Sequence, residues 1–484
     1  MGARAGRRDG VILGLLAAAA VSYVLQQTLV VPALPSLQRD LHTSATWTAW
    51  VFTGFLLTSA VFTPLMGKLG DMYGKKRMLV VALLVFALGT VACALADSIA
   101  LLIAGRAVQG VGGAVFPLSF GILRDELPPE RVGVGLGLLS ATFGVGGGLG
   151  LVLSGVILDH LSWSWLFWIG AVPVVVALVL VWAFVPESPV RTPARLDWAG
   201  ALTLSAALAA LMVALSEGDS WGWLSATTLG VFALSLLMTL AWVAVERRVA
   251  EPLIDLRLMR APAVLWTNVV AVLTGFAMFG TFLLVPTLVQ LPRGLPPDVA
   301  AMVGFGFGAS VIVAGLYLLP ASAIMLVAGP LGGLAERRFG ARGVCATGLV
   351  ALALGGLLLA VAHGSGAGVV AAMTLVGVGV GLAYAMLAKL IVDAVPPAVT
   401  GVAMGMNTVM RTIGGVVGGQ VGAALLSSIT IGSTSVPAES AFTTTFLLSA
   451  GVAVGAAVAS LGVPRRRAAG ARVVHAPEPA AVRE

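Results

Sequence analysis

Long apolar segments alternate with short polar connections along almost the whole chain. Each segment approaches the about 20 apolar residues that an α-helix needs to cross a bilayer. Cutting the chain at its charged and turn-rich connections leaves fourteen such segments. The pattern therefore predicts an all-α membrane protein with fourteen transmembrane helices, at roughly 11–37, 48–67, 78–96, 99–123, 132–158, 165–185, 197–216, 224–245, 265–289, 305–331, 343–363, 368–392, 400–428 and 440–462.

The composition supports a membrane protein rather than a soluble one. Of the 484 residues, 59% are hydrophobic and 10% are charged, whereas soluble domains carry about 25% charged residues. The basic start followed by an apolar run has the look of a signal peptide. That run continues to about Leu37 without a small-residue cleavage site, which favours a retained first span. Cys93 and Cys345 both lie in apolar segments, so neither a disulfide framework nor a metal site is indicated.

Positive charge is concentrated in the connections on one side of the predicted membrane. That side holds the N-terminal arginines, the basic triplet 75–77 and the tail 464–472, while the opposite side holds only Arg39 and Arg293. Cytoplasmic loops carry an excess of Lys and Arg, so we expect both termini in the cytoplasm and the protein in the plasma membrane. Topology and contact with lipid headgroups then explain the net charge of +7, and no nucleic-acid partner is expected.

An internal repeat relates the first and last parts of the chain. The segment "LPPERVGVGLG" (127–137) aligns without gaps to "VPPAVTGVAMG" (395–405), and "GKLGDMYGKKR" (67–77) aligns to "GGLAERRFGAR" (332–342) with one residue slipped. The separations of 268 and 265 residues exceed what two adjacent six-helix halves need by about two spans. We therefore predict a six-helix bundle at 1–190, two inserted helices with flanking loops at 191–260, a second six-helix bundle at 261–462 and a cytoplasmic tail at 463–484.

The segment "GKLGDMYGKKR" carries the most specific motif. Its glycines, Gly67, Gly70 and Gly74, permit a tight turn and close helix contact. Asp71 can cap the N-terminus of a neighbouring helix, and the basic triplet that ends at Arg77 holds the loop at the lipid surface. The segment resembles the loop between spans two and three of the major facilitator superfamily, whose fold has two parallel six-helix bundles. The resemblance implies a latch on the cytoplasmic gate.

Two arginines lie deep inside predicted spans. Arg106 is about 12 Å below the outer surface and Arg411 about 16 Å from the cytoplasmic side, at about 1.5 Å per residue. Arg106, Gln109 and Gly110 are similar to the fourth-span Arg-x-x-Gln-Gly motif of proton-coupled exporters. Charges at this depth usually mark a transport pathway. The alternative for both is a structural arginine bonded to backbone carbonyls.

The sequence does not identify an obvious proton carrier. The first span of proton-coupled exporters typically has an aspartate where this chain has Gln26, and the fifth span has Gly-Pro where this chain has Gly150 and Leu151. The best remaining candidates for coupling are Asp125 and Glu126, which follow the fourth span on the same helix as Arg106, and Asp71 is the other possibility. Partial burial would tune the protonation of one of them. The alternative is a solvated helix end.

The segments 161–173, 196–223 and 246–260 also resemble the fourteen-span drug:proton antiporter branch of the same superfamily. With the motifs above, the resemblance covers nearly the whole chain apart from the tail. It implies a proton-coupled secondary transporter that exports amphipathic organic compounds, drugs and antibiotics among them, by alternating access. An uncoupled facilitator, or an exporter dedicated to one endogenous metabolite, lipid or siderophore, is the alternative.

The expected substrate cavity lies between the two bundles. It would be lined by apolar side chains and a few polar ones, for which the candidates are Gln26, Gln27, Asn268, Gln290 and Asn407. The scarcity of carboxylates leaves the charge of the substrate open. The sequence has no enzymatic motif such as HExxH and no phosphate-binding GxxxxGK[ST] loop, so we expect neither an enzyme nor a cofactor. The abundance of Ala, Gly and Val, with Arg preferred over Lys, is typical of a GC-rich bacterial genome, and a monomer is expected.

Overall fold

The computed structural model describes residues 2–191, 197–249, 251–293, 295, 297–300, 302–432, 434 and 436–464. Over these ranges the chain is helical, and its single β feature is an isolated bridge between Thr430 and Pro437. The predicted all-α class is therefore confirmed for this part of the chain. Of the predicted tail 463–484, all but the first two residues lie outside the described residues.

Six crossings come from the first part of the chain and six from the last, with two between them. The first six are α1 (Gly2–Leu29), α3 (Ala45–Tyr73), α4 (Lys75–Ala94), α5 (Ile99–Gln109) continued through η2 (Gly110–Ala114) into α6 (Val115–Glu126), α7 (Pro129–His160) and α8 (Ser164–Phe184). The middle two are α9 (Trp198–Trp221) and α10 (Ala226–Glu246). The last six are α12 (Pro262–Phe282) continued into α13 (Leu284–Gln290), two crossings in α15 (Val311–Ala362), then α16 (Gly366–Ala394), α17 (Thr400–Ser428) and α18 (Glu439–Ser460).

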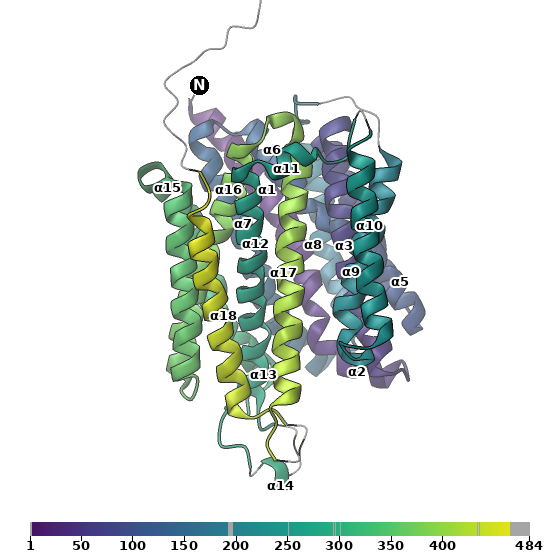
Figure 1. Ribbon diagram of the computed structural model, residues 1–484, viewed down its shortest axis with the longest axis vertical. Coiled ribbons are helices and arrows are strands. Elements are labelled where there is room, and N and C mark those ends of the chain that lie inside the picture. Colours follow the sequence, from purple (N-terminus) through teal and green to yellow (C-terminus); the bar gives the residue numbers. More distant parts are fainter. Residues whose placement is uncertain are drawn as a thin grey trace, which may run out of the picture.

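Short helices occupy the connections between these crossings. They are η1 (Val31–Ala33), α2 (Leu34–Asp40), α11 (Leu256–Arg260), α14 (Pro297–Ala300) and η3 (Pro397–Val399). Figure 1 shows α2 and α14 at one end of the bundle and α11 at the other, where the N-terminus also lies.

The predicted number of crossings agrees with the structure. Thirteen described helical segments are long and apolar enough to cross a membrane. One of them, α15, is interrupted at Gly340, whose φ of 75° and ψ of 149° are not helical, so its 52 residues make two crossings. Fourteen crossings result.

The fourth crossing departs from the continuous helix that the sequence predicts. Residues 110–114 form the 3-10 segment η2. A Cβ added to Gly110 would lie 2.6 Å from the carbonyl oxygen of Phe55, and one added to Gly112 would lie 2.9 Å from the ring of Phe86. The close approach of α3 and α4 thus requires glycine here, and the tighter helix follows from that packing.

The two repeated segments form equivalent turns. Gly74, between α3 and α4, has a φ of 115°, and Gly340, inside α15, has a φ of 75°. Both values lie in the region that favours glycine. The other repeated pair places Pro-Pro at the start of α7, which begins at Pro129, and at the start of η3, which leads into α17. The similarity of the two halves in sequence therefore extends to their backbone.

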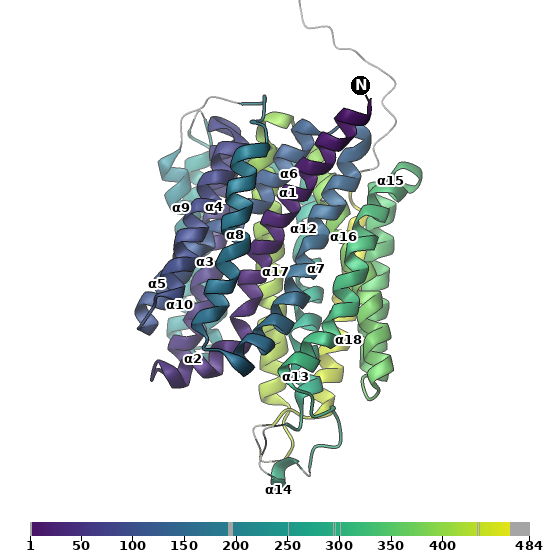
Figure 2. The same ribbon diagram turned by 180° about the vertical axis from the view of Figure 1, so that it is seen from behind.

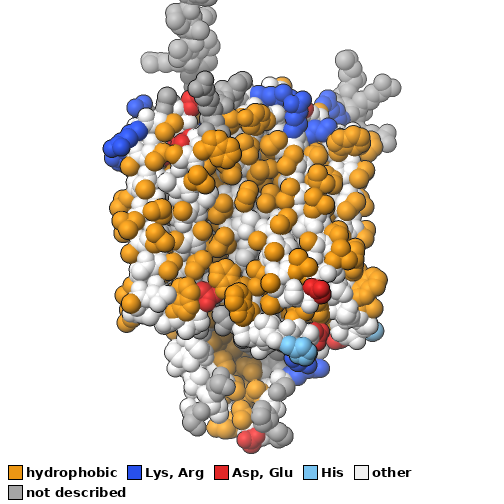
Figure 3. All heavy atoms as spheres, turned by 90° about the vertical axis from the view of Figure 1, so that its right-hand side faces the viewer, with side chains coloured by type: hydrophobic (Ala, Val, Ile, Leu, Met, Phe, Trp, Pro, Cys, Tyr) orange, Lys and Arg blue, Asp and Glu red, His pale blue; other side chains and the backbone are white. Residues whose placement is uncertain are grey.

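One end of the bundle carries most of the Lys and Arg side chains, as Figure 3 shows, and we call it the basic end. The turns after α3 and α6 and the start of α17 lie there. An apolar band covers the side of the bundle between the basic end and the opposite end. Such a band fits the hydrocarbon layer of a membrane.

The two halves meet along α3 with α17 and α7 with α15. The inserted α9 packs against α3 and α17, so the inserted pair covers one of these two seams. In that contact Met212 and Leu215 of α9 are buried with Ala60 of α3. Figures 1 and 2, which show opposite faces, both place α9 and α10 beside α3.

Candidate functional site

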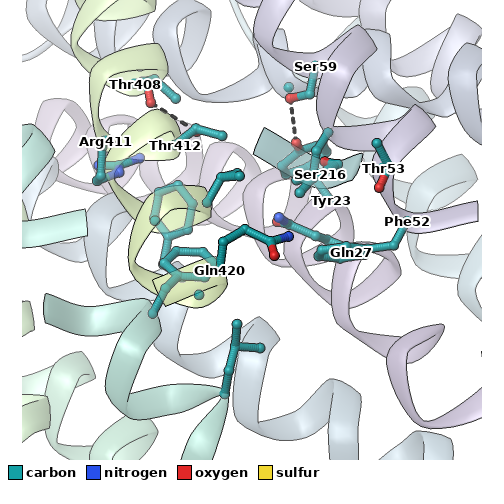
Figure 4. A pocket seen from close by; sticks show the side chains of 18 of the residues that line it. Tyr23, Gln27, Phe52, Thr53, Ser59, Ser216, Thr408, Arg411, Thr412 and Gln420 are labelled. Atoms are coloured by element: carbon teal, nitrogen blue, oxygen red, sulfur yellow. Dashed lines mark hydrogen bonds between the residues drawn. The ribbon is translucent and has the colours of Figure 1, made fainter. Parts of the chain in front are cut away.

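A cavity of about 270 Å³ lies between the two halves, near the middle of the bundle. Both halves and the inserted α9 contribute to its wall. The polar side chains that line it include Tyr23, Gln27, Thr53, Ser59, Ser216, Tyr384, Thr408, Arg411, Thr412 and Gln420, most of which are labelled in Figure 4.

A smaller, more apolar cavity of about 100 Å³ adjoins the first. The two share the side chains of Gln27, Phe52, Phe143, Phe279 and Leu283. The second is lined by residues 28 and 31 near the end of α1 and residue 151 of α7, which lie beyond the midpoint of helices that begin at the basic end. The combined space therefore extends from the middle of the bundle toward the opposite end.

Contacts between the halves close the bundle at the basic end. The two carboxylate oxygens of Asp71 accept hydrogen bonds of 3.1 Å each from the backbone N–H groups of Gly401 and Val402. These are first-turn residues of α17, so Asp71 of one half caps a helix of the other, as the motif predicts. Arg124 of α6 adds a 2.7 Å hydrogen bond to the carbonyl oxygen of Val395 and one to the hydroxyl of Thr400.

The glycines of the predicted gating loop permit this closure. A Cβ on Gly67 would collide with the backbone of Gly401, and one on Gly70 with the side chain of Leu118. Gly74 supplies the turn between α3 and α4. Arg77, by contrast, is exposed at the surface, where its Nε lies 3.7 Å from Glu187.

A buried cluster of charges lies behind the Asp71 cap. The ammonium of Lys75 lies 2.6 Å from Asp125 and 3.6 Å from Asp71, and all three side chains are at most 3% exposed. The hydroxyl of Ser188 also donates to Asp125. Asp125 is therefore buried, unlike a solvated helix end, whereas Glu126 pairs with the exposed Arg8 at 3.3 Å. One lysine thus serves two buried carboxylates.

Arg106 is completely buried and is hydrogen-bonded to other residues of the first half. Its Nε donates to the carbonyl oxygen of Val51 at 2.9 Å, and Nη1 donates to the carbonyl of Gln26 at 3.2 Å and to Oε1 of Gln109 at 2.8 Å. Gln109 in turn donates to Thr90 at 2.7 Å. This set joins α5 to α1, α3 and α4. Arg106 lines neither of the two cavities.

Arg411 lies at the boundary between the halves and lines the larger cavity. Its guanidinium carbon is 4.3 Å from the ring centroid of Phe143 in α7 and 4.3 Å from that of Tyr384 in α16. Its Nη2 is buried without a hydrogen-bond partner among the described residues. Backbone carbonyls were the expected partners, and aromatic rings hold the guanidinium instead.

Of the five polar side chains proposed for the cavity, Gln27 lines it. The amide of Gln26 is buried against Gly170 of α8, with no hydrogen-bond partner among the described residues. Asn407 donates to Asn268 at 2.9 Å and so joins α17 to α12. Gln290 bonds the carbonyl oxygen of Pro286 in its own helix. The last four lie outside both cavities because they turn toward neighbouring helices or their own backbone.

An aromatic cluster that the sequence pattern does not reveal forms part of the wall of the larger cavity. The rings of Phe116 and Phe143 stack at 3.9 Å between centroids, with Tyr23 6.1 Å from Phe116 and Tyr384 5.7 Å from Phe143. Because these residues lie in continuously apolar spans, their type alone does not distinguish the cavity from the core. The polar tips of the two tyrosines are the one signal that the sequence offers.

Comparisons with known proteins agree with this architecture. The chain matches the family model of the Major Facilitator Superfamily over residues 16–419 and 306–483. It is 30% identical over 397 residues to "Multidrug resistance protein 3" of Bacillus subtilis (strain 168), covering 81% of this chain and 74% of that protein. It is 31% identical over 385 residues to "Tetracenomycin C resistance and export protein" of Streptomyces glaucescens, covering 78% and 69%.

Solved structures share the fold at low sequence identity. The human organic anion transporter MFSD10 superimposes with a TM-score of 0.68 at 16% identity, over 93% of this chain and 99% of that one. The proton:xylose symporter XylE does so with a TM-score of 0.63 at 14% identity, over 95% and 96%. The predicted fold of two six-helix bundles is confirmed.

Proposed function

Because the chain belongs to the major facilitator superfamily, whose members are transporters and not enzymes, we propose that it exports amphipathic organic compounds by alternating access. The observation that carries this proposal is the cavity between the halves, closed at the basic end and extended toward the opposite end. Relatives described as multidrug resistance and antibiotic export proteins support the direction of transport and the substrate class.

We take the basic end as cytoplasmic, since Lys and Arg are concentrated in cytoplasmic loops. A cysteine scan tests this orientation in whole cells, because Cys93 and Cys345 are buried and give little background. An impermeant maleimide should label Asp298→Cys, at the opposite end, and leave Arg338→Cys unlabelled until the cells are opened. If Arg338→Cys alone is labelled in intact cells, the basic end lies outside the cell and the orientation is the opposite one.

Proton coupling is assigned to the buried cluster of Asp71, Lys75 and Asp125. In the closed arrangement two N–H groups of α17 and one ammonium balance the two carboxylates. Opening of the basic end would remove the N–H donors and leave two carboxylates with one lysine. Like charges in a buried site favour protonation of one carboxylate. Opening and closing of the basic end would thus change the protonation of the cluster, which is the property that proton coupling requires.

The test is efflux in everted vesicles, measured with a panel of amphipathic dyes and antibiotics and with a protonophore as control. Asp125→Asn and Glu126→Gln are compared singly and together. We expect Asp125→Asn to abolish accumulation driven by a pH gradient and Glu126→Gln to leave most of it. Gradient-driven transport that survives both substitutions would refute the assignment, and transport indifferent to the protonophore would favour an uncoupled facilitator.

A further inference from the structure

We infer that the cavity binds organic anions with a flat aromatic body, and that Arg411 holds their anionic group. The inference rests on the proposed function in one respect, which is that the cavity between the halves is the transport site. It adds the class of substrate, which neither the composition nor the fold specifies.

The first observation is an uncompensated positive charge. Arg411 is 5% exposed and faces the larger cavity, and none of the described residues that line either cavity is acidic. Glu217 follows the lining residue Ser216 in the chain. It is buried outside the cavity, where it accepts a hydrogen bond of 2.9 Å from Ser220. The cavity is therefore positive.

The second observation is a pair of donors without acceptors. Both Nη2 of Arg411 and the hydroxyl of Tyr384 are buried with no hydrogen-bond partner among the described residues. They belong to one cluster, since the guanidinium lies over the Tyr384 ring. Buried polar groups nearly always have partners, and each exception asks for an explanation. A ligand carboxylate or sulfonate would accept from both groups.

Arg106 also lies over a ring, that of Phe55 at 4.2 Å, and its Nη2 also has no partner among the described residues, but its Nε and Nη1 are hydrogen-bonded. Three of its hydrogen bonds go to oxygen atoms of the protein. The contacts of the Arg411 guanidinium are two aromatic rings, and Arg411 lines the larger cavity, which Arg106 does not. Aromatic faces attract a guanidinium, yet they satisfy none of its N–H groups. A planar guanidinium with free N–H groups suits a carboxylate.

The remaining wall fits an aromatic body. The stacked rings of Phe116 and Phe143 and the edge of Tyr23 lie next to the guanidinium. Offset and edge-to-face contacts of this kind favour flat rings. A cationic ligand would find the same rings but would meet Arg411 in a site of low dielectric, where like charges repel strongly.

The test measures equilibrium binding to the purified protein in phosphatidylcholine nanodiscs, which contain no anionic lipid. The probes are 2-naphthoate, its uncharged analogue 2-naphthylmethanol and its cationic analogue 2-naphthylmethylammonium. We expect 2-naphthoate to bind about tenfold more tightly than the uncharged analogue, the difference that one hydrogen bond to a charged group supplies, and the cation to bind more weakly than either. Equal binding, or tighter binding of the cation, would overturn the inference.

Two substitutions assign the effect to Arg411. In Arg411→Gln the preference for the anion should disappear while 2-naphthylmethanol binds as before, which shows that the variant is folded. Thr408→Glu keeps the arginine and adds a carboxylate one turn away, and it should also abolish the preference. Arg338→Gln is the matched control, because Arg338 lies over Phe339 at 5.5 Å outside both cavities, and it should change nothing.

Dodecanoate separates an aromatic anion from a fatty acid. In a competition experiment, dodecanoate and unlabelled 2-naphthoate each displace bound 2-naphthoate. If dodecanoate does so at the lower concentration, the site prefers aliphatic anions and the aromatic class is refuted. These measurements need no gradient, so they are independent of proton coupling. Anion binding without gradient-driven efflux would refute the proposed function alone. Gradient-driven efflux of cations without anion binding would refute this inference alone.

Discussion

Two buried arginines, Arg106 in the first half and Arg411 in the second, differ in what surrounds them. Arg106 is bound by two backbone carbonyls and the amide of Gln109, and it connects four helices. Arg411 lies between two aromatic rings on the wall of the cavity, whereas Arg106 lines neither cavity, and each has an Nη2 without a partner among the described residues. Depth in the membrane is therefore a poor guide to role, and the partners of the side chain are a better one.

Replacement of Arg106 should have the largest effect on stability. Arg106→Met leaves the Gln109 amide and the carbonyls of Val51 and Gln26 without this donor, in a fully buried site. We expect a loss of about 2–4 kcal/mol of stability, since each buried polar group that loses its partner costs about 1–3 kcal/mol. The measurement is the thermal unfolding midpoint in detergent. A midpoint equal to that of wild type would contradict a structural role for Arg106.

Replacement of Arg411 should spare the fold and weaken ligand binding. In Arg411→Gln the two ring contacts are lost, at about 0.5–2 kcal/mol each, but a buried charge without a counter-ion is removed as well. We expect a midpoint close to wild type and about tenfold weaker binding of 2-naphthoate. If the variant instead unfolds as readily as Arg106→Met, the contrast between the two arginines fails.

The cap at the basic end should have a moderate effect. Asp71→Ala removes two hydrogen bonds from the first turn of α17, and a cap of this kind contributes about 1 kcal/mol. We expect the basic end to open about fivefold more often, seen as faster maleimide labelling of a cysteine at the buried Ala403. Asp255→Ala, which removes the cap of α11 in the connection before α12, is the control and should leave the rate unchanged.

Two adjacent glutamines should give the smallest and most selective effect. Gln26→Met replaces an amide that has no partner among the described residues, so stability should change by less than about 1 kcal/mol and ligand binding not at all. Gln27→Met alters the cavity wall and should change the affinity for 2-naphthoate. Equal effects of the two substitutions on binding would contradict the placement of Gln27 in the cavity and Gln26 outside it.

The sequence predicted features that depend on local pattern. The number of crossings, the turn at Gly74 and the ability of Asp71 to cap a neighbouring helix all follow from spacing and residue type. The charge pattern also separated the basic end from the opposite one. These features need no knowledge of which helix lies beside which.

The direction in which individual side chains point could not be predicted from the sequence. Gln26 and Gln27 are neighbours, but one helical step of about 100° turns the first toward α8 and the second into the cavity. In a soluble helix the polar face would reveal this rotation. Here both lipid and core are apolar, so the pattern of apolar residues does not fix it. The partnership of Lys75 with Asp125, across 50 residues, is likewise a matter of packing.

Thermal unfolding with and without 2-naphthoate tests the contrast between the two arginines most directly, because the unfolding midpoint reports on stability and its rise on adding ligand reports on binding. Arg106→Lys and Arg411→Lys both keep a positive charge and lose the planar guanidinium. We predict that Arg106→Lys unfolds at a lower temperature and is still stabilised by 2-naphthoate. Arg411→Lys should unfold near the wild-type temperature with most of that stabilisation lost. The reverse pattern would contradict the assignment of Arg106 to the fold and Arg411 to the ligand.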